Sequence, residues 1–258
     1  GSCEIREVDG DKDIIVVIPT TDYDGKYART CREEIFKGLH IVFVVSGKNN
    51  FYFNYAHNCN VGIKKALEYN PKWIVVSNDD MIKIDNVEKL KDSLKSILFT
   101  KPTFVYSKTR KTTANTVKLA KSTLKRKFLY YIVKKYTRNI ISLEKKFRIN
   151  YLVSSNDFPY YLLFKEVFSS FPGKSDFAIF SNSLLNDLPY LFDETFINGG
   201  EDIDSSLSIF IRKPHYHEIE FEIFSYGGGT LGKRGRMLKD IMNLAYLNQK
   251  LDLYIRWI

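Results

Sequence analysis

Three short acidic clusters hold the side chains of this sequence that are best suited to chemistry. Asp22 and Asp24 follow an apolar run, an Asn-Asp-Asp triplet follows another at residues 78–80, and residues 201–204 (Glu-Asp-Ile-Asp) follow two glycines. Carboxylates can accept protons, bind divalent cations, or act only in turns and at helix starts. The first two clusters are expected at the carboxyl ends of strands, where open α/β sheets bind their ligands.

The triplet formed by Asn78, Asp79 and Asp80 directly follows a predicted buried strand. Acidic groups in that position repel each other and lose hydration, and a divalent cation removes this conflict. Mg²⁺ and Mn²⁺ take oxygen ligands, and Mg²⁺ is typically held by one or two carboxylates plus substrate phosphates. Asn and Asp also favour turns and helix starts. Taken alone, the triplet leaves both interpretations open.

The acidic run at residues 201–204 opens a predicted helix. Asp and Glu in a first helical turn are ordinary complements to the helix dipole. The functional interpretation is that one of these carboxylates acts as a general base over a bound substrate. The run alone does not decide between the two.

The elements that must position these clusters alternate between strands and helices. Apolar runs predict strands, and amphipathic spacing predicts helices between them. This alternation indicates βαβ units and a mostly parallel sheet. The predicted strands are 14–18, 41–45, 73–76, 103–106, 176–180 and 218–224, and the predicted helices are 27–36, 55–69, 87–98, 183–188, 203–211 and 236–258.

Positive charge is concentrated in one segment. Residues 108–148 hold fourteen Lys or Arg and one Glu, a net +13, so the other 217 residues carry −4 of the total of +9. Apolar residues from Val117 to Phe147 recur mostly every three or four positions, which predicts one or two basic amphipathic helices. Such a helix can bind an anionic membrane surface. Alternatively, its apolar stripe packs on the domain and its lysines are solvated. The charge is not accompanied by any RNP, KH or zinc-finger pattern, which disfavours nucleic acid as a partner.

Composition excludes several classes of protein. A hydrophobic content of 44% with 15% aromatic residues argues against disorder. The longest apolar runs have five or six residues, far short of a membrane span. The three cysteines, Cys3, Cys31 and Cys59, form no CxxC motif, which predicts a reduced, cytoplasmic protein. If the basic segment binds anionic lipid, the protein would be peripheral on the cytoplasmic membrane face.

Together, the clusters and the elements around them resemble the inverting glycosyltransferases of family 2, which have the GT-A fold. The resemblance covers roughly residues 13–106 and 175–212, about half of the chain. Its motifs follow in order: the first strand and its exit (15–22), a helix segment (58–63), the triplet in the place of a DxD motif (77–81), and an F-D-E-x-F, G-E-D-x-D and Arg ending (192–196, 200–204 and Arg212). This ending is the most specific part, because its order and spacing after the triplet are hard to obtain by chance.

The resemblance implies a role for each matching residue. Asp80, with Asn78, would hold a divalent cation (Mn²⁺ or Mg²⁺) that bridges the donor diphosphate. Asp202 would be the general base that deprotonates the acceptor hydroxyl, with Glu201 as the alternative. Asp204 would have a structural role in the helix or its loop, and so would Arg212. The donor site would be formed by Pro19, Thr20, Thr21, Asp22, Ser46, Asn78 and Asp79, with Lys233 and Arg234 reaching the diphosphate.

Three positions depart from the family pattern. Ser46 stands where many relatives carry an acid, the DxD-like motif begins with Asn78, and Ser225 stands where a histidine often precedes the C-terminal glycine loop. The first departure bears on base recognition and the second on metal affinity. At the third, His215 or His217 could substitute only if the backbone brings them back to the loop.

The sequence therefore predicts a single GT-A-type α/β domain with a mostly parallel sheet. Its predicted parts are a nucleotide-sugar-binding half (1–107), a basic helical insertion (108–150), an acceptor and catalytic half (151–232) and a C-terminal amphipathic helix (233–258). The expected reaction is sugar transfer from a nucleotide-diphosphate donor to a glycan, lipid-linked or protein hydroxyl, with inversion. Two alternatives are a nucleotidyltransferase and a catalytically inactive GT-A-like binding or scaffold protein.

Overall fold

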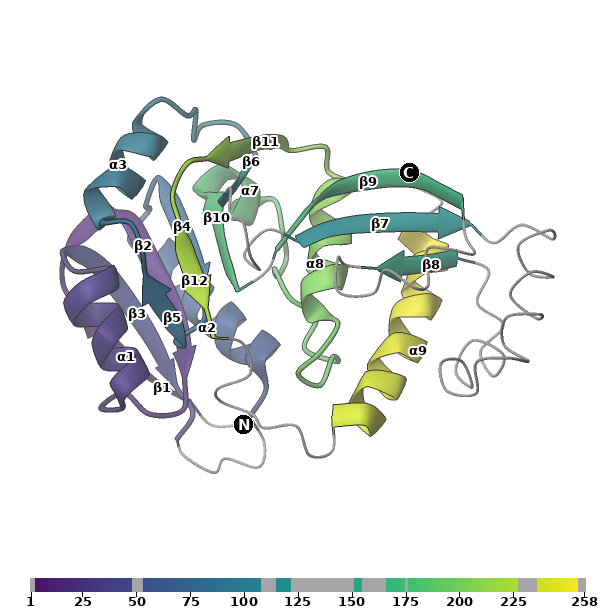
Figure 1. Cartoon of the computed structure of the whole chain (residues 1–258), viewed down its shortest axis with the longest axis horizontal. Coiled ribbons are helices and arrows are strands. Elements are labelled where there is room, and N and C mark those ends of the chain that lie inside the picture. The colour runs from purple at the N-terminus through teal and green to yellow at the C-terminus, as the bar shows by residue number, and fades with distance from the viewer. Residues whose placement is uncertain are drawn as a thin grey trace.

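The computed structural model describes residues 3–47, 53–107, 115–121, 151–154, 166–174, 176–226 and 236–254. Its centre is a seven-stranded mixed sheet with helices on both faces (Figure 1). The strand order is β1 (Glu4–Val8), β3 (Leu39–Val45), β2 (Asp11–Thr20), β4 (Trp73–Ser77), β10 (Phe177–Ser181), β6 (Thr103–Ser107) and β11 (His215–Ile219). Among the described helices, none has both the length and the apolar character needed to cross a bilayer.

The prediction of a mostly parallel sheet is wrong. Strand β2 runs parallel to β3 and β4, and β11 runs parallel to β6. The edge strand β1 is antiparallel to β3, and β10 is inserted antiparallel between β4 and β6. Half of the six neighbouring pairs are therefore antiparallel. The reversal has a local consequence, because the start of β10 lies beside the end of β4, with Phe177 opposite Ser77.

Both faces of the sheet are buried, which explains the uninterrupted apolar strands. Alternate residues of β2 point to opposite cores: Val16 packs with α1 (Lys26–Thr30) and α3 (Val87–Lys95), and Val17 packs with α2 (Tyr55–Leu67) and α7 (Asn182–Asn186). The strands predicted at 14–18, 41–45, 73–76 and 103–106 are confirmed within slightly longer elements.

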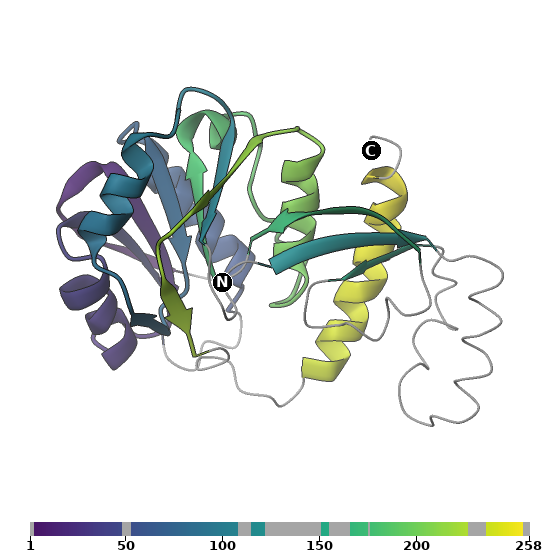
Figure 2. The ribbon, with the colours of Figure 1, turned by 45° about the horizontal axis from the view of Figure 1, so that its top comes forward.

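A smaller body lies beside the main sheet, on the far side of α8 (Glu201–Phe210), as two views agree (Figures 1 and 2). It contains a three-stranded sheet, in the order β8 (Tyr151–Ser154), β7 (Asn115–Lys121) and β9 (Glu166–Gly173), and the C-terminal helix α9 (Arg236–Tyr254). Strands β7 and β9 and helix α9 share one apolar core with α8, formed by Val117, Leu119, Phe171, Phe196, Leu207, Leu247 and Leu251.

The predicted basic helix does not begin at Val117. Residues 115–121 form β7, the central strand of the small sheet. Val117 and Leu119 are both buried, which is the two-residue alternation of a strand, and pairing with two neighbours overrides the local three- and four-residue spacing. The rest of the predicted helix, from residue 122 to Phe147, lies outside the described residues.

Other differences concern element boundaries and type. The helix predicted at 27–36 is α1 followed by a π-helical turn, η1 (Cys31–Ile35). The strand predicted at 218–224 is two strands, because β11 ends at Ile219 and β12 (Ile223–Ser225) pairs instead with β5 (Met81–Lys83). The predicted C-terminal helix is confirmed over the described residues as α9.

The tight packing of α2 on the sheet gives a first prediction. A Cβ atom at Gly62 would collide with the Val17 side chain and lie 2.9 Å from Val44 Cγ2. Gly62→Ala is therefore expected to destabilise the fold by about 1–3 kcal/mol through overpacking, although Ala in open space would strengthen the helix. Chemical denaturation measures whether the free energy of unfolding of the variant is lower or higher than that of the wild type. Lys64→Ala, on the exposed side of the same helix, is the control, and a more stable Gly62→Ala variant would contradict the packing.

Candidate active site

Polar residues gather where the parallel strands of the main sheet end. Thr20 ends β2, and its hydroxyl donates to Asp79 Oδ2 at 2.7 Å. Ser46, which follows β3, donates to the Thr20 carbonyl through both its backbone N–H (3.0 Å) and its hydroxyl (3.3 Å). The structure thus brings together three residues that the sequence assigned to the donor site.

The loop after β2 lies against the same edge. Pro19 is buried within β2, opposite Val44 of β3. Asp22 turns back on the strand end, because its N–H donates to the Thr20 hydroxyl at 3.3 Å. Thr21 is half-buried between them. All four residues from 19 to 22 therefore lie, as predicted, at the edge of the main sheet where the parallel strands β2, β3 and β4 end, which we call the strand-end edge.

Asp79 and Asp80 are both buried but face different neighbours. Asp79 faces β2 through Thr20, and its carbonyl accepts from the Cys31 thiol at 3.3 Å. The Asp80 carbonyl accepts from the N–H of Tyr226 at 3.1 Å, just after β12. Ser225 is 3.5 Å from Asp80 Oδ1. The chain that continues to Lys233 and Arg234 thus leaves the described residues beside Asp80, and these two predicted diphosphate contacts lie outside the described part.

Asn78 connects the strand end to a residue that sequence reasoning missed. Because β10 is antiparallel to β4, Asp176 lies next to Asn78, and the Asn78 N–H donates to its carbonyl at 2.8 Å. The Asn78 amide donates to Asp176 Oδ1 at 2.8 Å, and its Oδ1 accepts from the Tyr55 hydroxyl at 2.9 Å. Both polar atoms of the Asn78 side chain are thus engaged within the protein.

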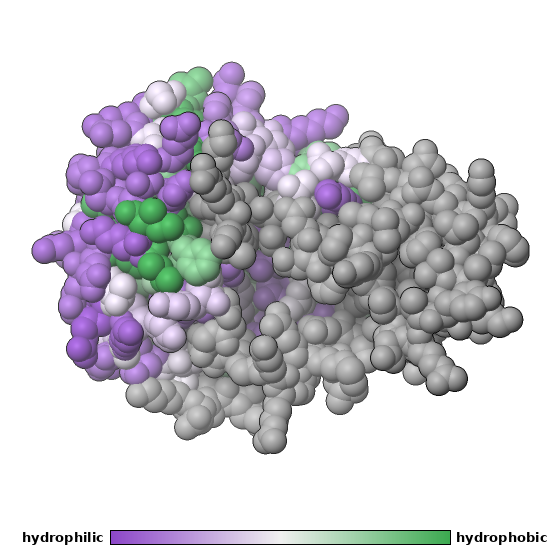
Figure 3. Space-filling view, viewed as in Figure 1, coloured by the Kyte–Doolittle hydropathy of each residue, from purple (hydrophilic) through white to green (hydrophobic). Residues whose placement is uncertain are grey.

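Lys174 joins this network to the start of α8. The side chain is fully buried, and its Nζ donates to Asp202 Oδ1 at 2.9 Å and to the Tyr55 hydroxyl at 3.1 Å. A continuous chain of hydrogen bonds therefore runs from Asp202 through Lys174 and Tyr55 to Asn78. The two acidic motifs that the sequence placed far apart lie in one site. In the space-filling view, hydrophilic side chains line a hollow near the middle of this face (Figure 3).

Helix α8 presents its two first acids differently. The helix begins after Gly200, whose φ of 88° lies in the left-handed region that favours glycine. Glu201 is 6% exposed, and its carboxylate accepts from the Gly199 N–H. The Asp202 side chain is 36% exposed. Of the two candidate bases, Asp202 is therefore the one that a substrate can reach.

Two acids of the site, Asp176 and Glu201, have raised pKa values. Burial, together with the negative charge of Asp202, raises the pKa of Asp176 to about 6. Burial and the same neighbouring charge raise the pKa of Glu201 to about 7. Burial lowers the pKa of Lys174, but the charge and hydrogen bond of Asp202, together with the charges of Cys59 and Asp176, outweigh it and the net shift is upward. Perturbed groups of this kind gather at functional sites.

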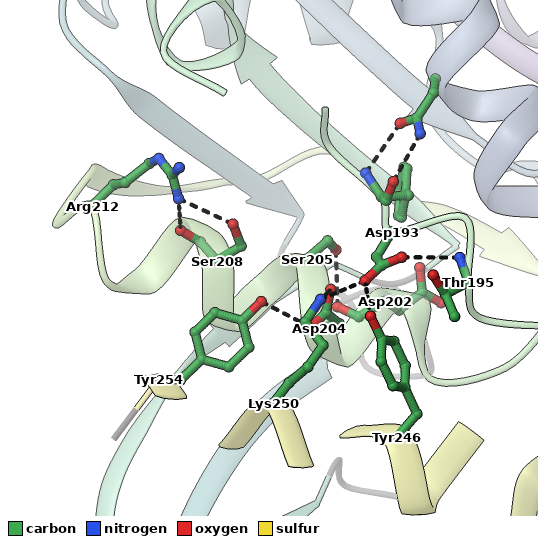
Figure 4. Close-up of polar contacts among 12 residues, drawn as sticks. Asp193, Thr195, Asp202, Asp204, Ser205, Ser208, Arg212, Tyr246, Lys250 and Tyr254 are labelled. Atoms are coloured by element: carbon green, nitrogen blue, oxygen red, sulfur yellow. Dashed lines mark hydrogen bonds and ion pairs between the residues drawn. The ribbon is translucent and has the colours of Figure 1, made fainter. Parts of the chain in front are cut away.

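Asp204 and Arg212 have the structural surroundings that the sequence suggested. Asp204 points toward α9, where Lys250 Nζ donates to its Oδ2 at 2.8 Å and the Tyr254 hydroxyl donates to its Oδ1 at 2.9 Å (Figure 4). Lys250 also binds Asp193 Oδ2 at 2.7 Å. Arg212 donates to the carbonyl of Ser208, one turn earlier in the chain. Asp204, Asp193 and Lys250 thus clamp α8 to α9.

The clamp gives a second prediction. Lys250→Met should destabilise the fold by about 3 kcal/mol, because it leaves two largely buried carboxylates unpaired. Although burial opposes it, the hydrogen bond from Lys250 lowers the pKa of Asp193, so this stabilisation exists above the carboxyl's unfolded pKa and is lost in acid. Denaturation at pH 7 and pH 3 should show the wild-type advantage shrinking at pH 3. Gln249→Met, an exposed neighbour, is the control, and a constant advantage would contradict the ion pairs.

No protein-family model and no curated protein sequence matches the chain. Within the described part, no group of three or more His, Cys, Asp or Glu side chains is arranged as a metal site.

The residues that sequence reasoning missed are Tyr55, Lys174 and Asp176. One signal pointed to Asp176: an acid directly before an apolar strand, which matches the acids directly after β4. Because β10 runs antiparallel to β4, the acid before β10 lies beside the residues that follow β4. For Tyr55 and Lys174 the sequence holds no comparable signal.

Proposed function

We propose that the chain is an inverting glycosyltransferase of GT-A type, which transfers a sugar from a nucleotide-diphosphate donor to an acceptor hydroxyl. The observation that carries the proposal is the hydrogen-bonded chain from Asn78, at the end of β4, to Asp202, at the start of α8. It joins a polar strand-end edge, suited to a nucleotide, to an accessible carboxylate suited to act as a base.

The donor side is supported by the strand ends. Thr20, Ser46 and Asp79 lie together at the carboxyl ends of parallel strands, where α/β sheets bind nucleotides. Their hydroxyl and carboxylate groups can hydrogen-bond a ribose or a base. The resemblance to family 2 implies that the nucleoside would bind at this edge.

The residues present fit a divalent cation held with the help of the donor. Asp80 offers a carboxylate, and burial together with the charges of Asp202 and Asp80 raises the pKa of Asp176, which is the unfavourable like-charge state that a cation relieves. Two carboxylates plus phosphate oxygens are sufficient for Mg²⁺. Asp80 would hold the ion, whereas Asn78, with both side-chain polar atoms engaged, would orient the site. When bound, the cation would neutralise charge on the leaving diphosphate.

The acceptor side is supported by Asp202. As the acceptor oxygen attacks the anomeric carbon, its proton passes to the Asp202 carboxylate. The bond from the anomeric carbon to the diphosphate breaks, and its electron pair leaves with the nucleoside diphosphate. One displacement from the face opposite the leaving group inverts the configuration.

A panel of nucleotide sugars tests the proposal. The protein is incubated with UDP- and GDP-sugars and a mixture of hydroxyl acceptors, with Mn²⁺ or with EDTA, and nucleoside diphosphate release is measured. We expect Mn²⁺-dependent release, and an inverted anomeric configuration in the product by NMR. Binding of UDP or GDP without release would identify a binding protein, and pyrophosphate release from a nucleoside triphosphate would identify a nucleotidyltransferase.

The basic segment supports a membrane-associated acceptor as part of the proposal. Its net +13 between residues 108 and 148 is suited to anionic lipid. Replacing Lys125, Arg126 and Lys127 with Glu should weaken flotation with vesicles containing phosphatidylserine by about tenfold or more, since each removed cation near the surface is worth about 1 kcal/mol. Uncharged phosphatidylcholine vesicles are the control. Undiminished flotation would show that these three cations do not contact lipid.

A further inference from the structure

We propose that Lys174 is the positioning residue for the general base, and that it fixes the Asp202 carboxylate in place. This inference rests on the proposed function and adds to it a residue that no motif contains. It is carried by the placement of a buried cation between the base and the strand-end edge.

The geometry around Lys174 leaves its ammonium little freedom. Its Nζ is 2.9 Å from Asp202 Oδ1 and 3.1 Å from the Tyr55 oxygen. The ammonium also lies 5.1 Å from the ring centre of Tyr55 and 5.2 Å from that of Phe192, which are cation–π distances. Its backbone N–H donates to the Ser206 hydroxyl at 2.9 Å, one turn along α8 from Asp202. Backbone and side chain of Lys174 thus both hold the start of α8.

Tyr55 connects Lys174 to the strand-end edge through two hydrogen bonds. Its hydroxyl proton is directed at Asn78 Oδ1, 2.9 Å away, so an oxygen lone pair is directed at Lys174. Asn78 is fixed in turn by Asp176. The position of the base is therefore set by the residues that end β4 and precede β10, rather than by α8 alone.

The energetics favour a functional reason for this cation. Withdrawing an ammonium from water is costly, and apolar replacements of buried ion pairs are often neutral or stabilising. Asp202 is 36% exposed and needs no buried partner for its own solvation. The buried cation is therefore explained by the orientation that it gives the Asp202 carboxylate, to which it donates a hydrogen bond at 2.9 Å.

The alternative role for Lys174 is to bind the donor diphosphate directly. Its side chain is 1% exposed, and its Nζ already donates to Asp202 Oδ1 and to the Tyr55 hydroxyl. A diphosphate ligand would affect donor affinity, whereas a positioning residue affects turnover. The two roles therefore separate in steady-state kinetics.

The test compares wild type, Lys174→Met, Lys174→Arg and Tyr55→Phe at saturating acceptor. For Lys174→Met we expect kcat to fall about 10- to 100-fold and the donor KM to stay within about twofold. Lys174→Arg keeps the charge and should recover part of the rate. Tyr55→Phe removes the hydrogen bonds to Asn78 and from Lys174 and should lower kcat about 2- to 10-fold, which keeps the inference testable if Lys174→Met does not fold.

Two results would overturn the inference. One is an unchanged kcat in Lys174→Met or, if that variant does not fold, an unchanged kcat in Tyr55→Phe. The other is a raised donor KM in Lys174→Met with kcat unchanged, which would assign Lys174 to the diphosphate. Failure of the proposed function looks different, because the wild type itself would then release no nucleoside diphosphate from any sugar donor.

Discussion

Replacing Asp202 with Asn is expected to lower the rate of sugar transfer by about 10²- to 10⁴-fold, the usual contribution of a general base. Asn keeps the size of the side chain and can still accept the hydrogen bond from Lys174, but it cannot take up the acceptor proton. Donor binding should persist, because the strand-end edge is unaltered. Turnover is measured with the best donor of the panel, and binding of the nucleoside diphosphate with Mn²⁺ is measured by calorimetry.

Glu201→Gln separates the two candidate bases. Burial raises the pKa of Glu201 to about 7, and its carboxylate is occupied by the Gly199 N–H, so we expect a much smaller effect than in Asp202→Asn. Asp187→Asn, an exposed acid just after α7, controls for the loss of charge alone. Retained transfer in Asp202→Asn together with loss in Glu201→Gln would move the base to Glu201.

Replacing Asp80 with Ala is expected to weaken Mn²⁺-dependent binding of the nucleoside diphosphate by about 100-fold or more. The variant removes the carboxylate that would bridge the cation to the phosphates, whereas binding measured in EDTA should change little. Without ligand, the free energy of unfolding of the variant should not fall for electrostatic reasons, because the substitution removes the negative charge of Asp80, which acts on Asp176. Calorimetry with and without Mn²⁺ measures the first effect, and thermal unfolding measures the second.

Asp24→Asn is the matched control for Asp80, since Asp24 is an exposed acid on the loop after β2. Equal affinity of Asp80→Ala and wild type in Mn²⁺ would contradict the metal role of Asp80. In that case Asp176, which lies beside Asn78, is the next carboxylate to replace.

Much of the main sheet could be predicted from the sequence because burial on both faces leaves a local trace. Residues 14–18 are apolar at every position, and the structure assigns alternate residues to two different cores. The direction of a strand leaves no such trace. The apolar residues of β10 would be the same whether its neighbouring strands were parallel or antiparallel. The sequence therefore did not predict that β10 is antiparallel to β4 and β6.

The residues of the candidate site likewise divide into those that the sequence could predict and those that it could not. Asp80 and Asp202 could be found because each stands in a short pattern of neighbouring residues. Lys174 stands between a glycine and a serine, and this sequence is typical of an exposed loop. Its burial comes from partners distant in the chain, Tyr55 and Asp202. Similarly, Val117 fits both a helical and a strand spacing, and only the pairing of β7 with two other strands decides between them.

The clamp between α8 and α9 has a consequence for how such a protein could diversify. The strands whose ends would receive the nucleotide pack in the two cores of the main sheet, whereas one flank of α8 packs in a third core, shared with the small sheet and the last helix. Substitutions in that third core are expected to shift α8 and the space in front of Asp202 while leaving the strand-end edge in place. Under the proposed function, the acceptor could therefore change while the sugar donor is kept.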